Sequence, residues 1–352
     1  MKDVSFLWIS MIAALLVISF CPRIHLTKAD NLTFAMWTSP TFSSLYSVYM
    51  VNAADGWAVG QDGTIIRWDG TQWTNATSPE TFTLYSLFMV NASDGWAVGQ
   101  DGTIIHWDGS SWKSVESPTH SNLFSVCMVG AADGWAVGSR GTIVGWNGTS
   151  WMNVTSPEIE DLNSVSMTNS TDGWAVGNGA FLHWNGTAWE IVQSLEGIGV
   201  FESVHVLNGD DAWAVGELGI VLHWDGSDWR DVVGGGTDVL NSVFFACPND
   251  VWMVGRPGTL FGIGGTGIIY HWNGTALTFV TSPTSNMQGL NSVFMLNDTD
   301  GWVVGQSGTI IRWNGTQWIP EFSRTPDMLL ITVLALVTAT IIAEKMKRPK
   351  TL

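Results

Sequence analysis

Seven aspartates recur along the chain, each two residues before a tryptophan, and they raise the question of a cation site. They are Asp55, Asp94, Asp133, Asp172, Asp211, Asp250 and Asp300. A calcium loop needs several oxygen ligands within a few residues of one another, whereas these aspartates are 39 or 50 residues apart. Each lies where a turn is expected, and a turn aspartate commonly accepts hydrogen bonds from its own backbone. We interpret the carboxylates as turn residues and predict no calcium site.

A second set of side chains with metal-binding chemistry precedes a second tryptophan in each unit. The set comprises Arg67, His106, Gly145, His183, His223, His271 and Arg312. Imidazole nitrogens bind zinc at about 2 Å, so four histidines at one recurring position suggest a metal centre. Successive repeat units pack about 10 Å apart, however, which is too far for their histidines to share an ion. We predict polar side chains packed beside tryptophan, with no metal and no cofactor.

We next consider whether the sequence contains the catalytic residues of a glycosidase or another enzyme. Glycosidases use paired carboxyl groups about 5–9 Å apart, and sialidases use a tyrosine nucleophile. The arginines here are scattered among different repeat positions, and Tyr46, Tyr49 and Tyr85 fall in segments expected at the centre of the fold. The sequence has no Ser-His-Asp signature or zinc-type Cys/His spacing, and the glycine run at 262–267 lacks the helix that a phosphate loop needs. We therefore predict a protein that is not an enzyme.

The elements that carry these residues form a repeat. The sequence DGWAVGQDGTIIRWDGTQW at 55–73 returns with few changes at 94–112, and there are seven such units in all. Each unit has three tryptophan slots, and tryptophan fills 20 of the 21 positions, Leu277 taking the other. Large flat side chains at fixed repeat positions indicate packing between neighbouring units. A sugar-stacking platform is the functional alternative.

Each unit contains four short apolar or β-branched segments separated by hairpin turns. In the first unit the segments are 45–51, 56–60, 64–68 and 72–77. Asn-Ala-Ala-Asp, Gln-Asp-Gly and Asp-Gly lie between them. Four antiparallel strands in about 40 residues, repeated seven times, predict an all-β fold: a seven-bladed β-propeller of four-stranded antiparallel blades. The segment 34–40 resembles 72–79, so we expect 34–39 to pair with the last blade, where 317–322 is the competing candidate.

The repeat GWAVG-x-x-GTII-x-W-[DN]-G-x-x-W resembles that of the photosystem II assembly and stability factor propellers. It also resembles the broader BNR or Asp-box propellers, and the resemblance covers 45–318. It implies the propeller fold and a binding or assembly scaffold. Asp-box propellers also include glycosidases, so a secreted, sialidase-like hydrolase and a purely structural envelope protein are the alternatives. The turn here reads Trp-Asp-Gly or Trp-Asn-Gly, where an Asp box often has Asp-Gly-Gly.

The two ends of the chain predict export and anchoring. The expected segments are a signal peptide at 1–29, the propeller at 30–319, a linker at 320–327, a transmembrane helix at 328–343 and a basic cytoplasmic tail at 344–352. A spanning helix usually has about 20 apolar residues, and the basic tail favours the cytoplasmic side. The Pro-Glu-Phe tripeptide at 320–322, the apolar segment and the basic tail resemble an archaeal PEF-type surface-sorting signal. A plain anchor helix is the alternative.

Charge and cysteine content agree with a monomeric propeller at the extracellular face of the cell membrane. Residues 30–327 carry 7 basic and 29 acidic residues, a net charge of −22. This excess argues against binding to nucleic acid or anionic lipid, so the expected partner is an unknown protein or a surface glycan. Cys127 and Cys247 lie in the third and sixth units, too far apart for a disulfide.

Ten Asn-x-Ser/Thr sequons predict a glycoprotein. They are Asn31, Asn75, Asn91, Asn147, Asn153, Asn169, Asn185, Asn273, Asn297 and Asn314. Seven of them fall in turns that a propeller would place on one face. The opposite face carries loops of varied sequence, where specificity usually resides. The candidate partner-binding residues there are Asp62, Asp101, Arg140, Glu158, Glu160, Asp161, Glu217, Arg256, Phe261 and Ser307.

Overall fold

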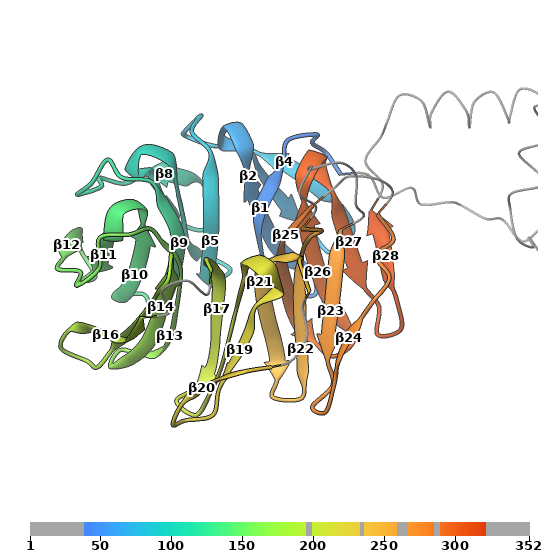
Figure 1. Ribbon diagram of the computed structural model, residues 1–352. Coiled ribbons are helices and arrows are strands. Elements are labelled where there is room, and N and C mark those ends of the chain that lie inside the picture. Colours follow the sequence, from blue (N-terminus) through green and yellow to red (C-terminus); the bar gives the residue numbers. More distant parts are fainter. Residues whose placement is uncertain (1–38, 195–198, 233–235, 259–266, 285–288, 322–352) are drawn as a thin grey trace, which may run out of the picture. The chain divides into compact units, whose positions relative to one another are not determined.

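The propeller fold class is confirmed by a computed structural model. The structure describes residues 39–194, 199–232, 236–258, 267–284 and 289–321. Within these ranges the chain forms seven four-stranded antiparallel sheets (Figure 1), each built from four strands consecutive in sequence and paired in that order. We number these sheets as blades 1 to 7 in chain order. Unlike the blades, the predicted segments 1–29 and 328–343 lie outside the described residues.

The strands occupy equivalent places in every blade. The first strands are β1 (Leu45–Asn52), β5 (Leu84–Asn91), β9 (Leu123–Gly130), β13 (Leu162–Asn169), β17 (Phe201–Asn208), β21 (Val239–Cys247) and β25 (Leu290–Asn297). The second strands are β2 (Asp55–Gly60), β6 (Asp94–Gly99), β10 (Asp133–Gly138), β14 (Asp172–Gly177), β18 (Asp211–Gly216), β22 (Asp250–Arg256) and β26 (Asp300–Gly305). First strands of neighbouring blades pack against one another, including β1 against β25, so the blades close into a ring with the first strands innermost.

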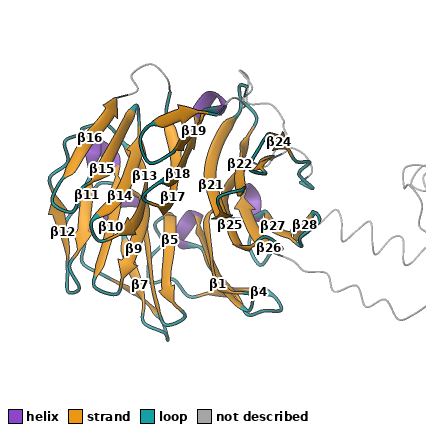
Figure 2. Ribbon diagram, turned by 90° about the horizontal axis from the view of Figure 1, so that it is seen from below, coloured by secondary structure: helices purple, strands orange, loops and turns teal. Residues whose placement is uncertain are grey.

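The outer half of each blade follows the same plan. The third strands are β3 (Ile65–Trp68), β7 (Ile104–Trp107), β11 (Ile143–Trp146), β15 (Ala180–Trp184), β19 (Val221–Trp224), β23 (Ile268–Trp272) and β27 (Ile310–Trp313). The fourth strands are β4 (Trp73–Ala76), β8 (Trp112–Ser114), β12 (Trp151–Val154), β16 (Trp189–Ser194), β20 (Trp229–Asp231), β24 (Leu277–Phe279) and β28 (Trp318–Glu321). Single 3-10 turns join second and third strands in five blades (Figure 2): η1 (Gln61–Gly63), η2 (Gln100–Gly102), η3 (Ser139–Gly141), η4 (Glu217–Gly219) and η5 (Gln306–Gly308).

Tryptophans fill the space between blades, as their spacing predicted. Trp57 of blade 1 packs on Trp107 and Trp112 of blade 2, with ring centroids 4.7 and 5.5 Å away and the second contact edge-to-face. The same arrangement closes the ring, because Trp302 of blade 7 lies 4.8 Å from Trp68 and 5.4 Å from Trp73 of blade 1. Each apolar cluster of the core therefore belongs to two neighbouring blades.

A serine in each first strand joins its blade to the next. Six of these serines accept a hydrogen bond of 3.1–3.3 Å from a backbone N–H of the following blade: Ser47 from Leu87, Ser86 from Val126, Ser125 from Val165, Ser164 from Val204, Ser203 from Val243 and Ser242 from Val293. The seventh, Ser292 of blade 7, accepts from the Val48 N–H of blade 1 at 3.3 Å. The serine bonds thus run unbroken around the ring.

The last blade takes its fourth strand from its own sequence. That strand is β28, so the expectation that 34–39 supplies it is wrong in favour of the competing segment 317–322. Residues 34–38 lie outside the described residues. The segment that follows them does reach blade 7: the Ser307 N–H donates to Ser44 Oγ at 3.4 Å. Entry segment 39–44 therefore bridges blades 7 and 1, as the linkers between other blades do.

The structure bears on the predicted absence of a disulfide and on the predicted membrane helix. Cys127, which is buried, and Cys247, which is exposed, are both free thiols. No helix among the described residues has the length and apolar character needed to cross a membrane, but the predicted anchor is not among them.

We expect the substitution Ser164→Ala to lower the free energy of unfolding by about 1–3 kcal/mol, because it leaves the buried Val204 N–H without this acceptor. Chemical denaturation measures the change. The control is Ser110→Ala, which removes a hydroxyl that donates to Asp108 in an exposed turn. Its effect should stay within about 0.5 kcal/mol. Equal losses of unfolding free energy in the two variants would mean that the serine hydrogen bonds between blades do not stabilise the propeller.

Candidate functional site

The first strand of every blade carries a β-bulge between its first fully buried apolar residue and the serine that bonds the next blade. In blade 1, Leu45 pairs with Gly60 and Ser47 with Val59, so Tyr46 is the extra residue. The same register shift recurs in the other six blades. We call the seven extra residues the bulge ring: Tyr46, Tyr85, Phe124, Asn163, Glu202, Asn241 and Asn291. Bulges re-aim side chains and are enriched beside functional sites, and all seven residues are partly exposed.

The bulge ring lies on one face of the propeller, which we call the linker face. There the 3-10 turns meet the linkers that enter the first strands: the Gln61 N–H donates to Ser44 O, and the Gln100 N–H to Thr83 O, both at 2.9 Å. Glycine at the end of the second strand permits this approach, because a Cβ on Gly60 would lie 2.1 Å from Ser44 O. The opposite face carries the first-to-second and third-to-fourth turns, and we call it the sequon face.

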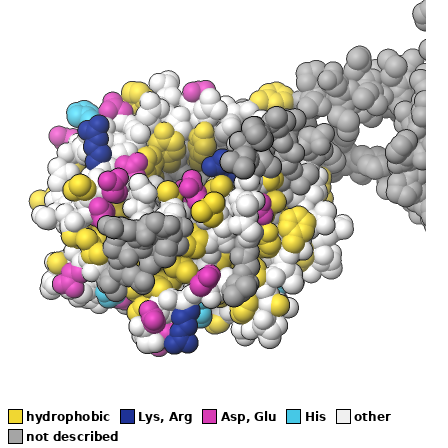
Figure 3. All heavy atoms as spheres, in the orientation of Figure 1, with side chains coloured by type: hydrophobic (Ala, Val, Ile, Leu, Met, Phe, Trp, Pro, Cys, Tyr) yellow, Lys and Arg dark blue, Asp and Glu magenta, His cyan; other side chains and the backbone are white. Residues whose placement is uncertain are grey.

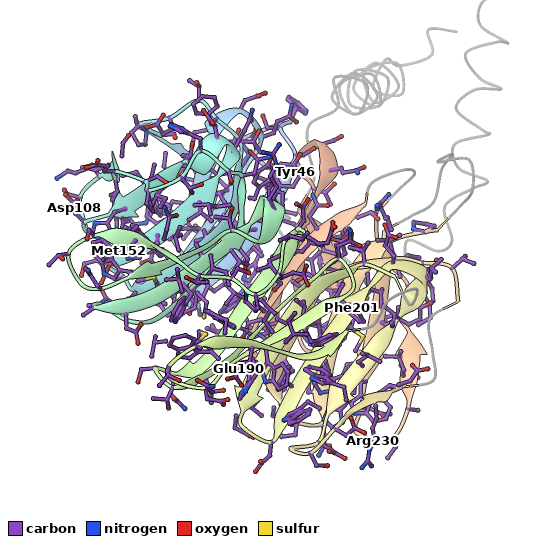
Figure 4. All side chains as sticks on the ribbon, turned by 60° about the vertical axis from the view of Figure 1, so that its left-hand side comes forward. Tyr46, Asp108, Met152, Glu190, Phe201 and Arg230 are labelled. Carbon is purple, nitrogen blue, oxygen red and sulfur yellow. The ribbon has the colours of Figure 1, made fainter. Side chains whose placement is uncertain are left out.

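Three aromatic side chains occupy one side of the bulge ring. The ring centroids of Tyr46 and Tyr85 are 5.8 Å apart, and those of Tyr85 and Phe124 are 5.6 Å apart. The three come from blades 1, 2 and 3, so they form an arc at the inner wall. Figure 4 shows Tyr46 at the inner strands, whereas Glu190 and Arg230 belong to outer strands. The arc offers aromatic faces to a ligand at the linker face.

The other side of the bulge ring is polar. Asn163, Asn241 and Asn291 each donate from Nδ2 to a carbonyl of the next blade, at 2.9, 2.7 and 2.8 Å. These asparagines join blades. Glu202 is the one charged member of the ring, and burial raises the pKa of its carboxyl; nearby Glu217 also raises it, and Arg256 lowers it. Two carboxylates and an arginine from blades 5 and 6 thus interact on the polar side of the bulge ring.

An uncharged aromatic layer lies beneath the bulge ring. Phe88, Tyr49, Phe294, Phe244 and His205 form a continuous chain of ring contacts with centroid distances of 4.3–5.0 Å. Burial lowers the pKa of His205 to about 4, so its imidazole is neutral at pH 7. Burial also raises the pKa of Tyr49 to about 12. We call these five residues the inner belt; it gives the bulge ring an apolar floor.

Left-handed backbone surrounds the site. A positive φ of 54–59° recurs at the middle residue of the five 3-10 turns: Asp62, Asp101, Arg140, Leu218 and Ser307. Side chains of the segments that lead into the first strands hold three of these turns: the Asp101 N–H donates to Asn122 Oδ1 at 2.9 Å, the Arg140 N–H to Asp161 Oδ1 at 2.8 Å and the Ser307 N–H to Ser44 Oγ at 3.4 Å. Residues other than glycine with strained backbone are enriched at functional sites. Here the five residues with positive φ all lie on the linker face.

The predicted partner-binding residues are distributed over this face. Asp62, Asp101, Arg140, Glu217 and Ser307 lie in 3-10 turns, Glu158, Glu160 and Asp161 lie in one linker, and Arg256 ends β22. Phe261 lies outside the described residues. The structure brings Arg140 to Asp161, and Glu217 and Arg256 to Glu202. The bulge ring was not predicted, although the sequence carries a signal for it: in the repeated Leu-x-Ser-Val pattern, x alone changes from aromatic to polar.

Six of the seven aspartates before tryptophan bond across the sheet instead of to their own turns, so the turn interpretation was wrong for these six; Asp133 accepts a hydrogen bond from the adjacent Gly134 backbone. The six accept from the third strand of the same blade: Asp55 from Arg67, Asp94 from His106, Asp172 from His183, Asp211 from His223, Asp250 from His271 and Asp300 from Arg312, at 2.7–3.0 Å. The turn is bonded by an earlier asparagine, as when the Ala54 N–H donates to Asn52 Oδ1. Each aspartate opens a strand, which directs its side chain across the sheet.

The histidines are polar side chains packed beside tryptophan, as predicted. Those of blades 2, 4, 5 and 6 lie over the first tryptophan of their own blade with centroid distances of 4.2–4.8 Å. Arg67 lies 4.9 Å over Trp57 in the same manner. Within the ranges that the structure describes, no three His, Cys, Asp or Glu side chains gather closely enough to hold a metal ion.

The fold defines the class of the protein as a seven-bladed β-propeller. No family model and no curated protein matches the chain. Solved structures do match it. YCF48 bound to D1 peptide has a TM-score of 0.62 at 16% identity, over 81% of this chain and 97% of that one. YCF48 from Cyanidioschyzon merolae has a TM-score of 0.62 at 16% identity, over 78% and 97%. The WD40 β-propeller domain of Doa1 has a TM-score of 0.61 at 16% identity, over 78% and 95%. These likenesses bear out a propeller fold like that of the photosystem II factors.

Blade 3 lacks the basic side chain that the other blades place against the aspartate, because Gly145 stands there. Burial raises the pKa of Asp133. The substitution Gly145→Arg should pair with Asp133 and lie over Trp135, and a Cβ there makes only ordinary contacts of 3.4 Å or more. We expect a gain of about 0.5–1.5 kcal/mol in unfolding free energy at pH 7.

The control for this prediction is Gly145→Gln, which adds a side chain without charge. The excess stability of the arginine variant over the glutamine variant requires ionised Asp133. It should therefore be present at pH 7 and be lost as the pH falls below the ordinary aspartate value of 3.8. Denaturation at several pH values measures it. A pH-independent excess would show that the arginine acts through packing alone.

Leu218 combines an exposed apolar side chain, 64% accessible, with a φ of 56°. Leucine in this conformation costs roughly 1–2 kcal/mol, and asparagine tolerates it better. We expect Leu218→Asn to raise the unfolding free energy by about 0.5–1 kcal/mol. Asp62→Asn, at the equivalent turn of blade 1, should change little. Destabilisation by Leu218→Asn in a denaturant melt would mean that contacts of the leucine outweigh its backbone strain.

Proposed function

We propose that this protein is an exported, membrane-anchored, non-catalytic propeller that binds a protein partner through its linker face. The partner protein contacts the bulge ring and the surrounding turns. The observation that carries the proposal is the difference between the two faces. Exposed large apolar side chains occur at the linker face in Phe42, Phe82, Ile159 and Leu218. Exposed apolar groups rimmed by polar residues mark interaction surfaces.

The sequon face supports the assignment from the other side. Its third-to-fourth turns use asparagine and aspartate in the same role: Asn147 Oδ1 accepts from the Thr149 and Ser150 N–H groups, as Asp69 Oδ1 does from Thr71 and Gln72. The turn needs only the oxygen, so its asparagines are free to serve as glycan acceptors. All nine sequon asparagines among the described residues are exposed. Glycans there would keep a protein partner off this face.

Similar folds and the chain ends support the remaining parts of the proposal. YCF48 is seen with a D1 peptide bound, so a propeller of this shape can hold a protein segment. The apolar start of the chain, the apolar segment 328–343 and the basic tail support export and anchoring. The acidic surface, visible in Figure 3 as acidic side chains spread over the face in view, disfavours nucleic acid and anionic lipid.

Matched lysine substitutions on the two faces test the proposal. Ile159→Lys places a charge in an exposed position of the linker face, and Val129→Lys does so near the first-to-second turn of the sequon face. Each variant is expressed in its native envelope with a proximity-labelling tag. We expect Ile159→Lys to reduce labelling of a specific partner at least tenfold, because a buried unpaired charge costs several kcal/mol at an interface. Val129→Lys should leave it unchanged.

Two outcomes would contradict the proposed function. Loss of labelling in Val129→Lys but not in Ile159→Lys would mean that the partner binds the sequon face and that the proposed face is wrong. Glu202 and Glu217 interact at the linker face, and a carboxyl pair is the equipment of a glycosidase. Hydrolysis of aryl glycosides by the purified chain, abolished by Glu202→Gln, would therefore show that the protein is an enzyme.

A further inference from the structure

The two sides of the bulge ring face each other across the propeller axis. In a closed ring of seven blades, blade 5 is three places from blade 1 in one direction and three from blade 2 in the other. Glu202 of blade 5 therefore lies opposite Tyr46 and Tyr85. The aromatic arc and the carboxylate of Glu202 thus lie on opposite sides of the axis. The inference drawn from this arrangement rests on the proposed function of the linker face. It specifies which side chain of the partner that face recognises.

The surroundings of Glu202 favour a positive charge. Glu202 is partly buried, and Glu217 adds a second negative charge that the nearby Arg256 does not fully offset. Asn163 Nδ2 approaches Glu202 Oε2 at 3.5 Å, which leaves most of the carboxylate's accepting capacity available. Beneath it lie the aromatic rings of the inner belt, with its imidazole neutral at pH 7. A cation in this setting gains more from the carboxylate than it would at an open surface.

The linker face around the ring is complementary to a basic segment. Its turns and linkers carry Asp62, Asp101, Glu158 and Asp161. An array of this kind steers a positively charged partner toward the axis and disfavours an acidic one. Among the described residues of this face, Arg140 and Arg256 are the arginines, and the first is held in a turn by Asp161.

The chain already holds two of its own arginines by the same combination of groups. Arg67 donates to Asp55 at 3.0 Å and lies 4.9 Å over the ring of Trp57. Arg312 donates to Asp300 at 2.9 Å and lies 4.9 Å over Trp302. A guanidinium suits such sites because it is planar, stacks on aromatic faces and bonds a carboxylate with several N–H groups.

We infer that the bulge ring binds an arginine side chain of the partner protein, with the guanidinium against Glu202 and its plane against the Tyr46–Tyr85–Phe124 arc. The carboxylate supplies charge and direction, and the arc supplies an apolar and aromatic surface for the flat group. The flanking acidic turns bind the rest of a basic segment. Recognition of one arginine in a partly buried site gives specificity that the uniformly acidic surface by itself does not.

Peptide selection on the purified full chain tests this inference. Random 12-residue peptides are selected by phage display, and the strongest binders are resynthesised with each arginine replaced by its neutral analogue citrulline. We expect the binders to share an arginine. Replacing it by citrulline, or substituting Glu202→Gln, should each weaken the dissociation constant more than tenfold. Combining the two changes should weaken binding no further, since both remove one interaction.

Matched variants make the result specific. Glu190→Gln makes the same chemical change on the outer strand β16 and should leave the dissociation constant unchanged. Tyr85→Leu keeps an apolar side chain but removes the aromatic face, and binding should weaken several-fold. Melting temperatures of all variants establish that each is folded. If Glu202→Gln alone unfolds the chain, the citrulline series and Tyr85→Leu still decide the question.

The failures of the two proposals can be told apart. Peptides that lose binding to Ile159→Lys but contain no arginine and ignore Glu202→Gln would overturn the arginine site and retain the linker face. Selected peptides rich in Asp or Glu would overturn it as well. Peptides that bind the unmodified chain and Ile159→Lys equally, yet lose binding to Val129→Lys, would contradict the proposed docking face itself.

Discussion

The wedge-shaped space between neighbouring sheets is the constraint on which this propeller depends. A tryptophan from one blade packs against a tryptophan of the next in seven successive interfaces, and in six of them a second tryptophan completes the contact, Leu277 standing in its place in blade 6. Twelve of these tryptophans bury an indole N–H for which the described residues offer no hydrogen-bond acceptor. Each such donor costs about 1–3 kcal/mol, whereas burying roughly 200 Å² of ring contributes about 5 kcal/mol. Filling the wedge therefore outweighs satisfying the donor.

Closure follows from the same contacts rather than from a separate device. Every blade draws its four strands from one continuous stretch. The junction of blades 7 and 1 has the tryptophan contact of Trp302, the serine bond of Ser292 and the asparagine bond of Asn291. The entry segment 39–44 contacts blade 7 as the linkers contact the preceding blade at the other junctions. Because all seven junctions share the tryptophan contact and the serine bond, the residues at the linker face can differ between blades without opening the ring.

This separation explains where the propeller can carry function. The interior repeats one solution, in which an aspartate, a basic side chain and a tryptophan are stacked within a blade. Blade 3 lacks the basic side chain and still has the same sheet. At the linker face, the bulge residues run from Tyr46 to Asn291 with three aromatic, three amide and one acidic member. The three amide members join neighbouring blades, so the aromatic and acidic members are the ones available for recognition.

The sequence by itself determined the number of blades, their strand order and the role of the tryptophans. A repeat of fixed length reports equivalent positions directly, and the turn residues separate the strands within each unit. It also placed Arg140, Glu217 and Arg256 on one face, because alternate turns of an antiparallel sheet must share a face. Only the tertiary structure showed that Asp55 bonds Arg67 instead of its own turn, and that β28 rather than 34–39 completes the last blade. It alone set Glu202 opposite Tyr46 and Tyr85. These residues are far apart in the chain, and a bulge of one residue decides where a side chain points, so only the closed ring fixes what each of them meets.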